Sequence, residues 1–256
     1  MAESFTFDVG THGSTTALVY RASEPIGSTL ILAHGAGASQ THPFLVDMAS
    51  RLANRGIDVV TFNFLYTEHG RKMPDRTDLL EACWHAAIAS VRARGGLPTA
   101  RLFCGGKSMG GRIVSNIAAT PAGVGLTLSG LVFLGYPLHP IGKPKARRDE
   151  HLSRVPFPML FVQGSRDELG TAAEIKKLVR RLPGASLHAV QGGDHSLALL
   201  KRDGGALAQE EALDGAAGAI LAFVRRAAGL RTVEPAKKTA NKSKKAKKEQ
   251  DPPPVL

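Results

Sequence analysis

Residues 105–112 read Gly-Gly-Lys-Ser-Met-Gly-Gly-Arg and directly follow an apolar run, Leu102-Phe103-Cys104. A phosphate-binding P-loop also ends in Gly-Lys-Ser, but it requires a glycine five residues before Gly106, where this chain has Arg101. The three residues between the apolar run and Ser108 are also too few to wrap a phosphate chain. The sequence therefore argues against a nucleotide-binding loop.

The same residues match the pattern G-x-S-x-G of a nucleophile elbow, with Ser108 between Gly106 and Gly110. In such an elbow the serine has strained backbone geometry, and the glycines let a strand and a helix approach each other. Backbone N–H groups at the start of the helix, here that of Met109, are suited to bind a developing oxyanion. Since the match lies between an apolar strand and a helical pattern, it predicts that Ser108 is a nucleophile.

A serine nucleophile needs a base and a carboxylate that orients the base. Asp167 follows a predicted strand at 159–163, and His195 follows a predicted strand at 186–190. The chain order serine, aspartate, histidine is the one that α/β-hydrolases use. We therefore expect Ser108, Asp167 and His195 to form a catalytic triad.

Neighbouring residues leave alternatives to this triad. Glu168 adjoins Asp167, while Asp194 adjoins His195 and is either a turn residue or the orienting carboxylate. Two further histidines lie in regular elements and are expected to be structural, His85 and His188.

A second oxyanion donor is expected at an early strand end. The stretch 31–39, Ile-Leu-Ala-His-Gly-Ala-Gly-Ala-Ser, has glycines that allow backbone amides to converge on one point. We expect the N–H of Ala36, or that of a neighbouring residue, to act with that of Met109. The alternative is a plain turn between a strand and a helix.

Short apolar segments alternate with helical patterns along the chain. Apolar residues recur three and four positions apart in 44–52, 79–91, 109–117, 175–182 and 213–224, which predicts helices. The alternation implies a mainly parallel sheet with helices on both faces, in which ligands bind at the carboxyl ends of the strands. The predicted strands are 16–20, 29–33, 58–63, 101–104, 130–135, 159–163 and 186–190.

The 256-residue chain has a formal net charge of +11 that is unevenly distributed. Residues 231–256 carry eight Lys or Arg against three acidic residues, and they contain few apolar side chains. This composition predicts a disordered tail after a single domain at 1–230. Such a tail attracts nucleic acid, anionic lipid or acidic proteins through salt-sensitive Coulomb forces, or it is solvated and has no dedicated partner.

The first residues lack the basic and then apolar pattern of a secretory signal. Residues 113–142 carry no Asp, Glu, Lys or Arg, but prolines and glycines interrupt them, which indicates a helix end, a loop and a buried strand. Cys83 and Cys104 lie in apolar stretches without metal-ligand spacing. We expect a soluble cytoplasmic protein with buried thiols, without a membrane span, a metal or a cofactor.

Together, these motifs resemble those of the α/β-hydrolase superfamily. More narrowly, the chain resembles a dienelactone-hydrolase-like group of small bacterial proteins, related to a vertebrate testis-expressed protein and to a chromatin-complex subunit. The narrower resemblance rests on His42-Pro-Phe, on residues 62–76 and on Gly135-Tyr-Pro-Leu-His-Pro, and it covers roughly residues 15–225. It implies the α/β-hydrolase fold with the predicted triad in place. It implies no substrate, because some relatives are interaction scaffolds.

The connection between residues 136 and 159 contains five prolines and is too short for a large helical lid, so the site is expected to be open. Our candidates for substrate contacts are Lys107, Arg71 and His34. Basic residues at the rim suggest an acidic or carboxylate-bearing substrate, or only a solvated surface: Arg71, Lys72, Lys107, Lys143, Lys145, Arg147 and Arg148. Charged residues after Asn63 are expected to order their loop through ion pairs, namely Glu68, Arg71, Asp75 and Arg76.

The expected chemistry is acyl transfer to the serine from an ester, a thioester or a related acyl bond of a small molecule, followed by hydrolysis of the acyl-enzyme. The alternative is a non-catalytic binding module of the same fold, whose basic tail binds nucleic acid or an acidic partner. The sequence does not define an oligomeric state.

Overall fold

Eight strands form one continuous sheet in the order β1-β2-β4-β3-β5-β6-β7-β8. The computed structural model describes residues 2–230, so the predicted tail at 231–256 lies outside the described residues. From β4 to β8 along the sheet, all neighbouring strands are parallel, which confirms the predicted mainly parallel sheet. The strands are β1 (Glu3–Asp8), β2 (Ser14–Tyr20), β3 (Thr29–Ala33), β4 (Asp58–Phe62), β5 (Leu102–Lys107), β6 (Gly130–Leu134), β7 (Met159–Gly164) and β8 (Ala185–Val190).

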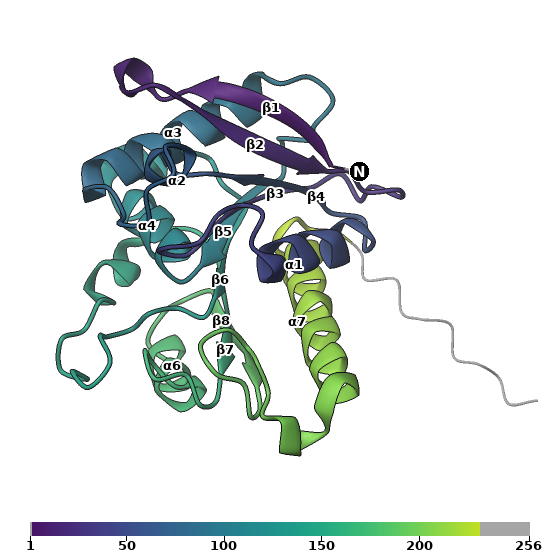
Figure 1. Cartoon of the computed structure of the whole chain (residues 1–256), viewed down its shortest axis with the longest axis vertical. Coiled ribbons are helices and arrows are strands. Elements are labelled where there is room, and N and C mark those ends of the chain that lie inside the picture. Colours follow the sequence, from purple (N-terminus) through teal and green to yellow (C-terminus); the bar gives the residue numbers. More distant parts are fainter. Residues whose placement is uncertain (1, 231–256) are drawn as a thin grey trace, which may run out of the picture.

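The first two strands form an antiparallel hairpin at the edge of the sheet (Figure 1). β2 also pairs antiparallel with β4. Because β1, β2 and β3 follow one another without an α-helix between them, the predicted alternation of strand and helix is wrong at this end of the chain. The turn between the strands contains η1 (Gly10–His12), and Gly10 has a φ of 54°, in the region that favours glycine. Only Phe7 of β1 is buried, because an edge strand packs one face alone.

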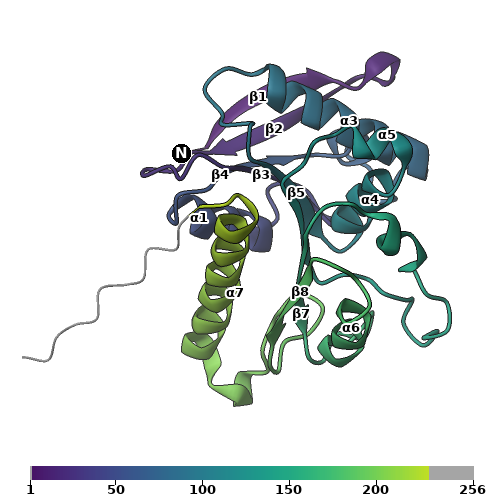
Figure 2. The same cartoon turned by 180° about the vertical axis from the view of Figure 1, so that it is seen from behind.

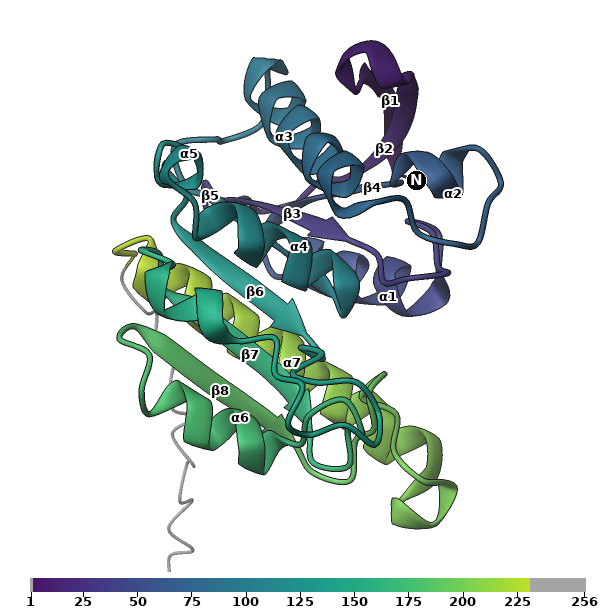
Figure 3. The ribbon, with the colours of Figure 1, turned by 90° about the vertical axis from the view of Figure 1, so that its left-hand side faces the viewer.

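Helices cover both faces of the sheet, as predicted (Figures 1 and 2). Helices α1 (Pro43–Ala53) and α7 (Gly205–Ala227) pack on one face. Helices α3 (Thr77–Ala93), α4 (Met109–Ala118) and α6 (Ala172–Val179) pack on the other, and Figure 3 shows the sheet between the two layers. The short elements are α2 (Leu65–Glu68), α5 (Pro121–Val124), η2 (Glu150–Arg154) and η3 (Lys201–Asp203).

The connection after β6 forms only the short η2 before β7, which confirms the absence of a large helical lid. The uncharged stretch 113–142 contains the end of α4 and the strand β6, as predicted, but the segment predicted as a loop between them contains the short helix α5. Within residues 2–230, each helix is too short or too polar to cross a lipid bilayer. The carboxyl ends of β3, β5, β7 and β8 therefore face an edge that no large insertion covers.

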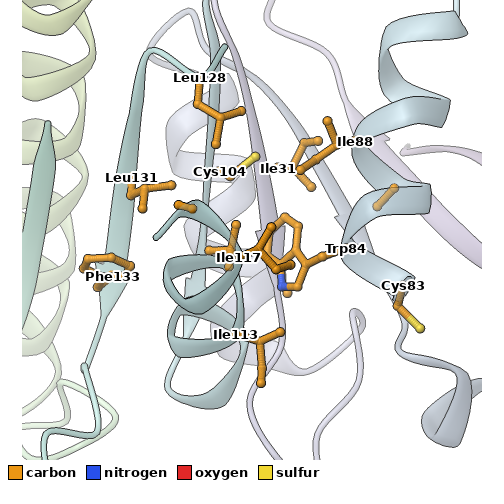
Figure 4. Close-up of a cluster of buried hydrophobic side chains, with 14 of the residues drawn as sticks. Ile31, Cys83, Trp84, Ile88, Cys104, Ile113, Ile117, Leu128, Leu131 and Phe133 are labelled. Carbon is orange, nitrogen blue, oxygen red and sulfur yellow. The ribbon is translucent and has the colours of Figure 1, made fainter. Parts of the chain in front are cut away.

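The larger core cluster packs α3 and α4 against the middle of the sheet (Figure 4). Trp84 of α3 is fully buried, and its indole N–H donates a hydrogen bond to the carbonyl oxygen of Gly110 at 3.1 Å. The core thus contacts the first turn of α4 directly. Cys83 and Cys104 are buried free thiols, as predicted, and burial raises the pKa of Cys83 to about 11.

Candidate active site

Ser108 occupies a sharp turn between β5 and α4. β5 continues through Gly105 and Gly106 to Lys107, three residues beyond the predicted strand end, and α4 begins at Met109. Ser108 itself has a φ of 51° and a ψ of −114°, a backbone conformation that side-chain-bearing residues rarely adopt. The strained elbow predicted from the sequence is therefore present.

Two glycines permit this elbow because the backbone of β3 passes close to both. A Cβ atom on Gly106 would lie 2.4 Å from the carbonyl oxygen of Ala33, and one on Gly110 would lie 2.6 Å from the same oxygen. Real Cβ atoms essentially never approach another atom so closely. Any side chain at either position would push β5 or α4 away from β3, so packing itself requires the glycines of the motif.

The elbow presents the Ser108 hydroxyl to an imidazole. Ser108 Oγ lies 2.9 Å from His195 Nε2, and His195 Nδ1 lies 2.8 Å from Asp167 Oδ2. The loops after β5, β7 and β8 supply one member each. Because an ionised carboxylate only accepts hydrogen bonds, Nδ1 carries the proton, which leaves Nε2 as the acceptor for the serine proton.

Asp167 is fully buried and is held by several donors. Its Oδ1 accepts a hydrogen bond from the Leu169 N–H at 2.8 Å. Its Oδ2 accepts one from Gln163 Nε2 at 2.7 Å in addition to that from His195. The carboxylate is therefore fixed in the position from which it orients the imidazole.

Gln163 links this carboxylate to two loops, and the sequence pattern did not identify it. Its Nε2 also donates to the carbonyl oxygen of Gly170 at 2.7 Å, and its Oε1 accepts from the Tyr136 N–H at 2.7 Å. Gln163 is the only polar side chain of the otherwise apolar β7. A polar side chain in a buried apolar strand needs hydrogen-bond partners, so its place just before the loop that contains Asp167 was the signal that could have identified Gln163 from the sequence.

The two alternative carboxylates do not contact His195. Asp194 Oδ1 accepts hydrogen bonds from the N–H groups of Ser196 and Ala198 at 2.7 and 2.9 Å, so Asp194 closes a turn. Glu168 is exposed. The histidines that we expected to be structural do not line the cavities at Ser108, namely His85 and His188.

The two expected oxyanion donors come from separate turns that reach the same cavity. Met109 N–H is the first of α4, and Ala36 belongs to the turn after β3. In the part of the chain that the structure describes, neither N–H donates a hydrogen bond to the protein. Both residues line one cavity together with Ser108. They are thus available to a ligand oxygen, and the dipole of α4 adds positive potential there.

His34 lines a cavity at Ser108 but has no nitrogen left for a substrate. Its Nδ1 donates to the carbonyl oxygen of Gly35 at 2.8 Å, and its Nε2 accepts from the Phe64 N–H at 3.1 Å. Burial lowers the pKa of His34 to about 4, so the ring is neutral near pH 7. The structure does not support the substrate contact expected of His34, which instead ties the loop after β3 to that after β4.

Two cavities meet at Ser108. The first has a volume of about 330 Å³ and is bordered by Lys107 and His195. The second has a volume of about 370 Å³ and lies on the Met109 side. Both are at the lower end of the range for small-molecule sites. Across residues 2–230, His, Cys, Asp and Glu side chains do not gather in a group of three or more suited to a metal.

Lys107 is the one predicted substrate contact whose side chain remains available in the first cavity. Burial lowers the pKa of Lys107 to about 8, although the nearby charges of Asp167 and Asp194 oppose that shift. Lys107 therefore retains a positive charge near pH 7 beside the serine and the imidazole.

Arg71 lines neither cavity at Ser108, so the structure does not support the substrate contact expected of it. Its guanidinium pairs with Asp75 at 2.7 Å. The predicted four-residue ion-pair cluster is wrong in its composition, because Arg76 pairs with Asp78 instead. Glu68 accepts hydrogen bonds from uncharged groups of β2 and the loop after β4, including Thr16 Oγ1 and Asn63 Nδ2.

The fold agrees with a comparison against protein families. A family model described as an alpha/beta hydrolase domain matches residues 27–225. This chain belongs to the alpha/beta hydrolase family. The matched region contains Ser108, Asp167 and His195.

Solved structures with the alpha/beta hydrolase fold superpose on most of the chain. A dienelactone hydrolase from Anabaena variabilis has 16% identity and a TM-score of 0.67, covering 88% of this chain and 97% of its own. A serine hydrolase without a lid from Xanthomonas campestris has 22% identity and a TM-score of 0.64, with coverage of 88% and 94%. An esterase domain from Rhodothermus marinus has 15% identity and a TM-score of 0.63, with coverage of 88% and 98%. At these identities the likeness shows the fold.

Proposed function

We propose that this alpha/beta hydrolase is a serine hydrolase that cleaves an ester, a thioester or a related acyl bond of a small substrate. The observation that carries the proposal is the hydrogen-bonded series from Ser108 Oγ through His195 to Asp167, with distances of 2.9 and 2.8 Å. A merely structural serine has no need of a strained backbone beside a cavity. The similar proteins described as esterases and serine hydrolases support the same reaction class.

The first half of the reaction forms an acyl-enzyme. Ser108 Oγ attacks the carbonyl carbon while His195 Nε2 takes its proton, and Asp167 stabilises the imidazolium. The N–H groups of Ala36 and Met109 bind the oxyanion of the tetrahedral intermediate. The intermediate collapses when the bond to the leaving group breaks, and His195 returns the proton to the departing oxygen or sulfur.

The second half releases the acid. Water attacks the acyl-enzyme while His195 takes one of its protons, and the same two N–H groups bind the second oxyanion. The ester bond to Ser108 then breaks, and Ser108 Oγ recovers its proton from the imidazolium. Asp167 stays ionised throughout.

Labelling with a fluorophosphonate probe tests the nucleophile. The wild-type protein should be labelled, and Ser108→Ala should abolish labelling. Ser196→Ala is the matched control, because Ser196 is an exposed serine that lines the first cavity and should leave labelling unchanged. Equal labelling of wild type and Ser108→Ala, or no labelling of the folded wild type, would reject the enzyme and favour the non-catalytic binding module.

A cytoplasmic location and the relationship to the vertebrate proteins remain predictions from the sequence.

A further inference from the structure

The two cavities at Ser108 differ in the catalytic groups that they contain. His195 lines the first cavity, and Met109 lines the second. Ser108 and Ala36 line both, so the serine stands at their boundary. A substrate attached to Ser108 therefore has one half in each cavity.

The position of the proton donor decides which half lies where. The leaving-group atom must come within hydrogen-bond distance of His195 Nε2 to receive a proton. The leaving group therefore belongs in the first cavity, beside Lys107 and His195. The acyl chain, which remains on Ser108, then extends into the second cavity.

Two arginines line the second cavity, Arg112 and Arg148. Arg112 lies one turn after Ser108 on α4, and its backbone N–H donates to the carbonyl oxygen of Ser108. Arg148 comes from the connection after β6. Within residues 2–230, no carboxylate lies within 4 Å of either guanidinium, whereas the neighbouring Arg147 pairs with Asp149.

The two arginines also act on each other electrostatically. Arg112 is half-buried, and its pKa is lowered first by burial and then by the charge of Arg148. Two neighbouring positive charges repel each other, and an anion bound between them relieves the repulsion. The cavity therefore favours an anionic ligand group over a neutral one.

The backbone of Arg148 is fixed although its side chain is exposed. The hydroxyl of the buried Tyr136 donates to the carbonyl oxygen of Arg148 at 2.7 Å, and the Arg148 N–H donates to the carbonyl oxygen of Leu138 at 2.9 Å. These bonds hold the start of its side chain at the cavity. Lys143 and Lys145, in the same connection, are exposed and line neither cavity at Ser108.

Asp75 is the acidic residue that lines the second cavity. Its Oδ1 pairs with Arg71, so the cations there still exceed the anions. Its Oδ2 is buried and has no hydrogen-bond partner in the described part of the chain. The pairing with Arg71 leaves Arg112 and Arg148 without a neutralising carboxylate among the described residues that line this cavity.

We infer that the acyl half of the substrate carries an anionic group, such as the free carboxylate of a dicarboxylic acid monoester, which Arg112 and Arg148 bind in the second cavity. The inference rests on the proposed function, because it assigns a substrate class to the same serine. The apolar side chains of Leu80 and Leu169 cover the chain between the scissile carbonyl and the charge.

Three esters test both the charge and its position. 4-Nitrophenyl hemiglutarate and 4-nitrophenyl valerate share a leaving group and a chain length but differ in the terminal carboxylate. 4-(Valeryloxy)benzoate places the carboxylate on the leaving group instead. We expect kcat/KM, after subtraction of the uncatalysed rate, to be at least about tenfold higher for the hemiglutarate than for the valerate. The benzoate should not share this advantage.

Variants assign the preference to the two arginines. Arg112→Gln and Arg148→Gln should each lower the ratio of kcat/KM for hemiglutarate over valerate, and the double variant should bring it close to one. Lys145→Gln is the control, since it removes one positive charge from the same connection outside both cavities, and it should keep the ratio. A ratio near one in the wild type, or a high ratio that survives in the double variant, overturns the inference.

Binding of glutarate gives a readout that needs no turnover. Glutarate should raise the melting temperature of the wild type and of Ser108→Ala, and it should not raise that of the double arginine variant. If the protein is labelled by fluorophosphonate but glutarate does not bind, the inference fails and the proposed function stands. If glutarate binds through the arginines but labelling fails, the proposed function fails and the anion site remains.

Discussion

Replacing Gln163 with leucine tests how the orienting carboxylate is held. The change removes the amide that donates to Asp167 and Gly170 and accepts from the Tyr136 N–H. The Tyr136 N–H and the Gly170 carbonyl then lose this partner at buried positions, at about 1–3 kcal/mol each. We therefore expect the free energy of unfolding, measured by urea denaturation, to fall by about 2–6 kcal/mol.

The catalytic rate should also fall, for a reason distinct from the loss of stability. In the variant the Asp167 carboxylate keeps the Leu169 N–H and His195 as its hydrogen-bond partners but loses Gln163. We expect kcat for 4-nitrophenyl acetate to fall at least about tenfold, towards the ~10⁴-fold loss that follows when a serine hydrolase loses its orienting carboxylate. KM should change little, since Gln163 lines neither cavity at Ser108.

Val162→Ala is the matched control for this substitution. Val162 is the preceding residue of β7, is fully buried and packs in the apolar core on the α7 side of the sheet. Its truncation should lower the free energy of unfolding by about 1–3 kcal/mol and leave kcat unchanged. If Gln163→Leu is as stable as the wild type, or if Gln163→Leu and Val162→Ala lose kcat equally, Gln163 is not a positioning residue.

Further predictions concern charges and packing near the site. Because the folded chain releases the Lys107 proton near pH 8, the unfolded chain binds more protons between about pH 8 and 10.5. The free energy of unfolding should therefore rise over this pH window by up to about 3 kcal/mol. Lys107→Met should remove that rise. The pKa of His34 and that of His151 are both lowered to about 4 by burial, so their NMR ring signals should remain those of neutral imidazole down to about pH 5. A Cβ on Gly105 would lie 2.0 Å from the carbonyl oxygen of Val132, so Gly105→Ala should lower the free energy of unfolding in urea by more than about 4 kcal/mol. Gly218 lies in open space on α7, so the control Gly218→Ala should leave the stability unchanged or raise it slightly.

The sequence predicted the central strands well, because they are buried on both faces and consist of continuous apolar runs. The bounds of β3 match the prediction, and those of β4 and β6 differ by one residue at the carboxyl end. β5 extends three residues beyond its prediction, since Gly105 and Gly106 have low strand propensity and are present only because neighbouring backbones approach them. β1 was missed because its partner β2 and one buried side chain, that of Phe7, stabilise it.

Candidate site residues could be named from the sequence where a residue type and a strand end sufficed. The structure brings Ser108, His195 and Asp167 into hydrogen-bond contact, as their chain order suggested. Gln163 and Arg112 were not identified, because their significance depends on contacts that link separate loops or on the lack of a counter-ion. Spacing along a sequence cannot reveal such features.

The part of the structure where the reaction is proposed contains two features that are unfavourable for folding. Ser108 has a left-handed backbone, and the charge of Arg112 is partly desolvated beside that of Arg148. Residues that bind or react are often retained at a cost to stability. Arg112→Gln should therefore raise the melting temperature while it lowers the preference for an anionic acyl chain. An arginine that only stabilised the fold would lower the melting temperature when replaced, so a lower melting temperature with an unchanged substrate preference would assign Arg112 to structure alone.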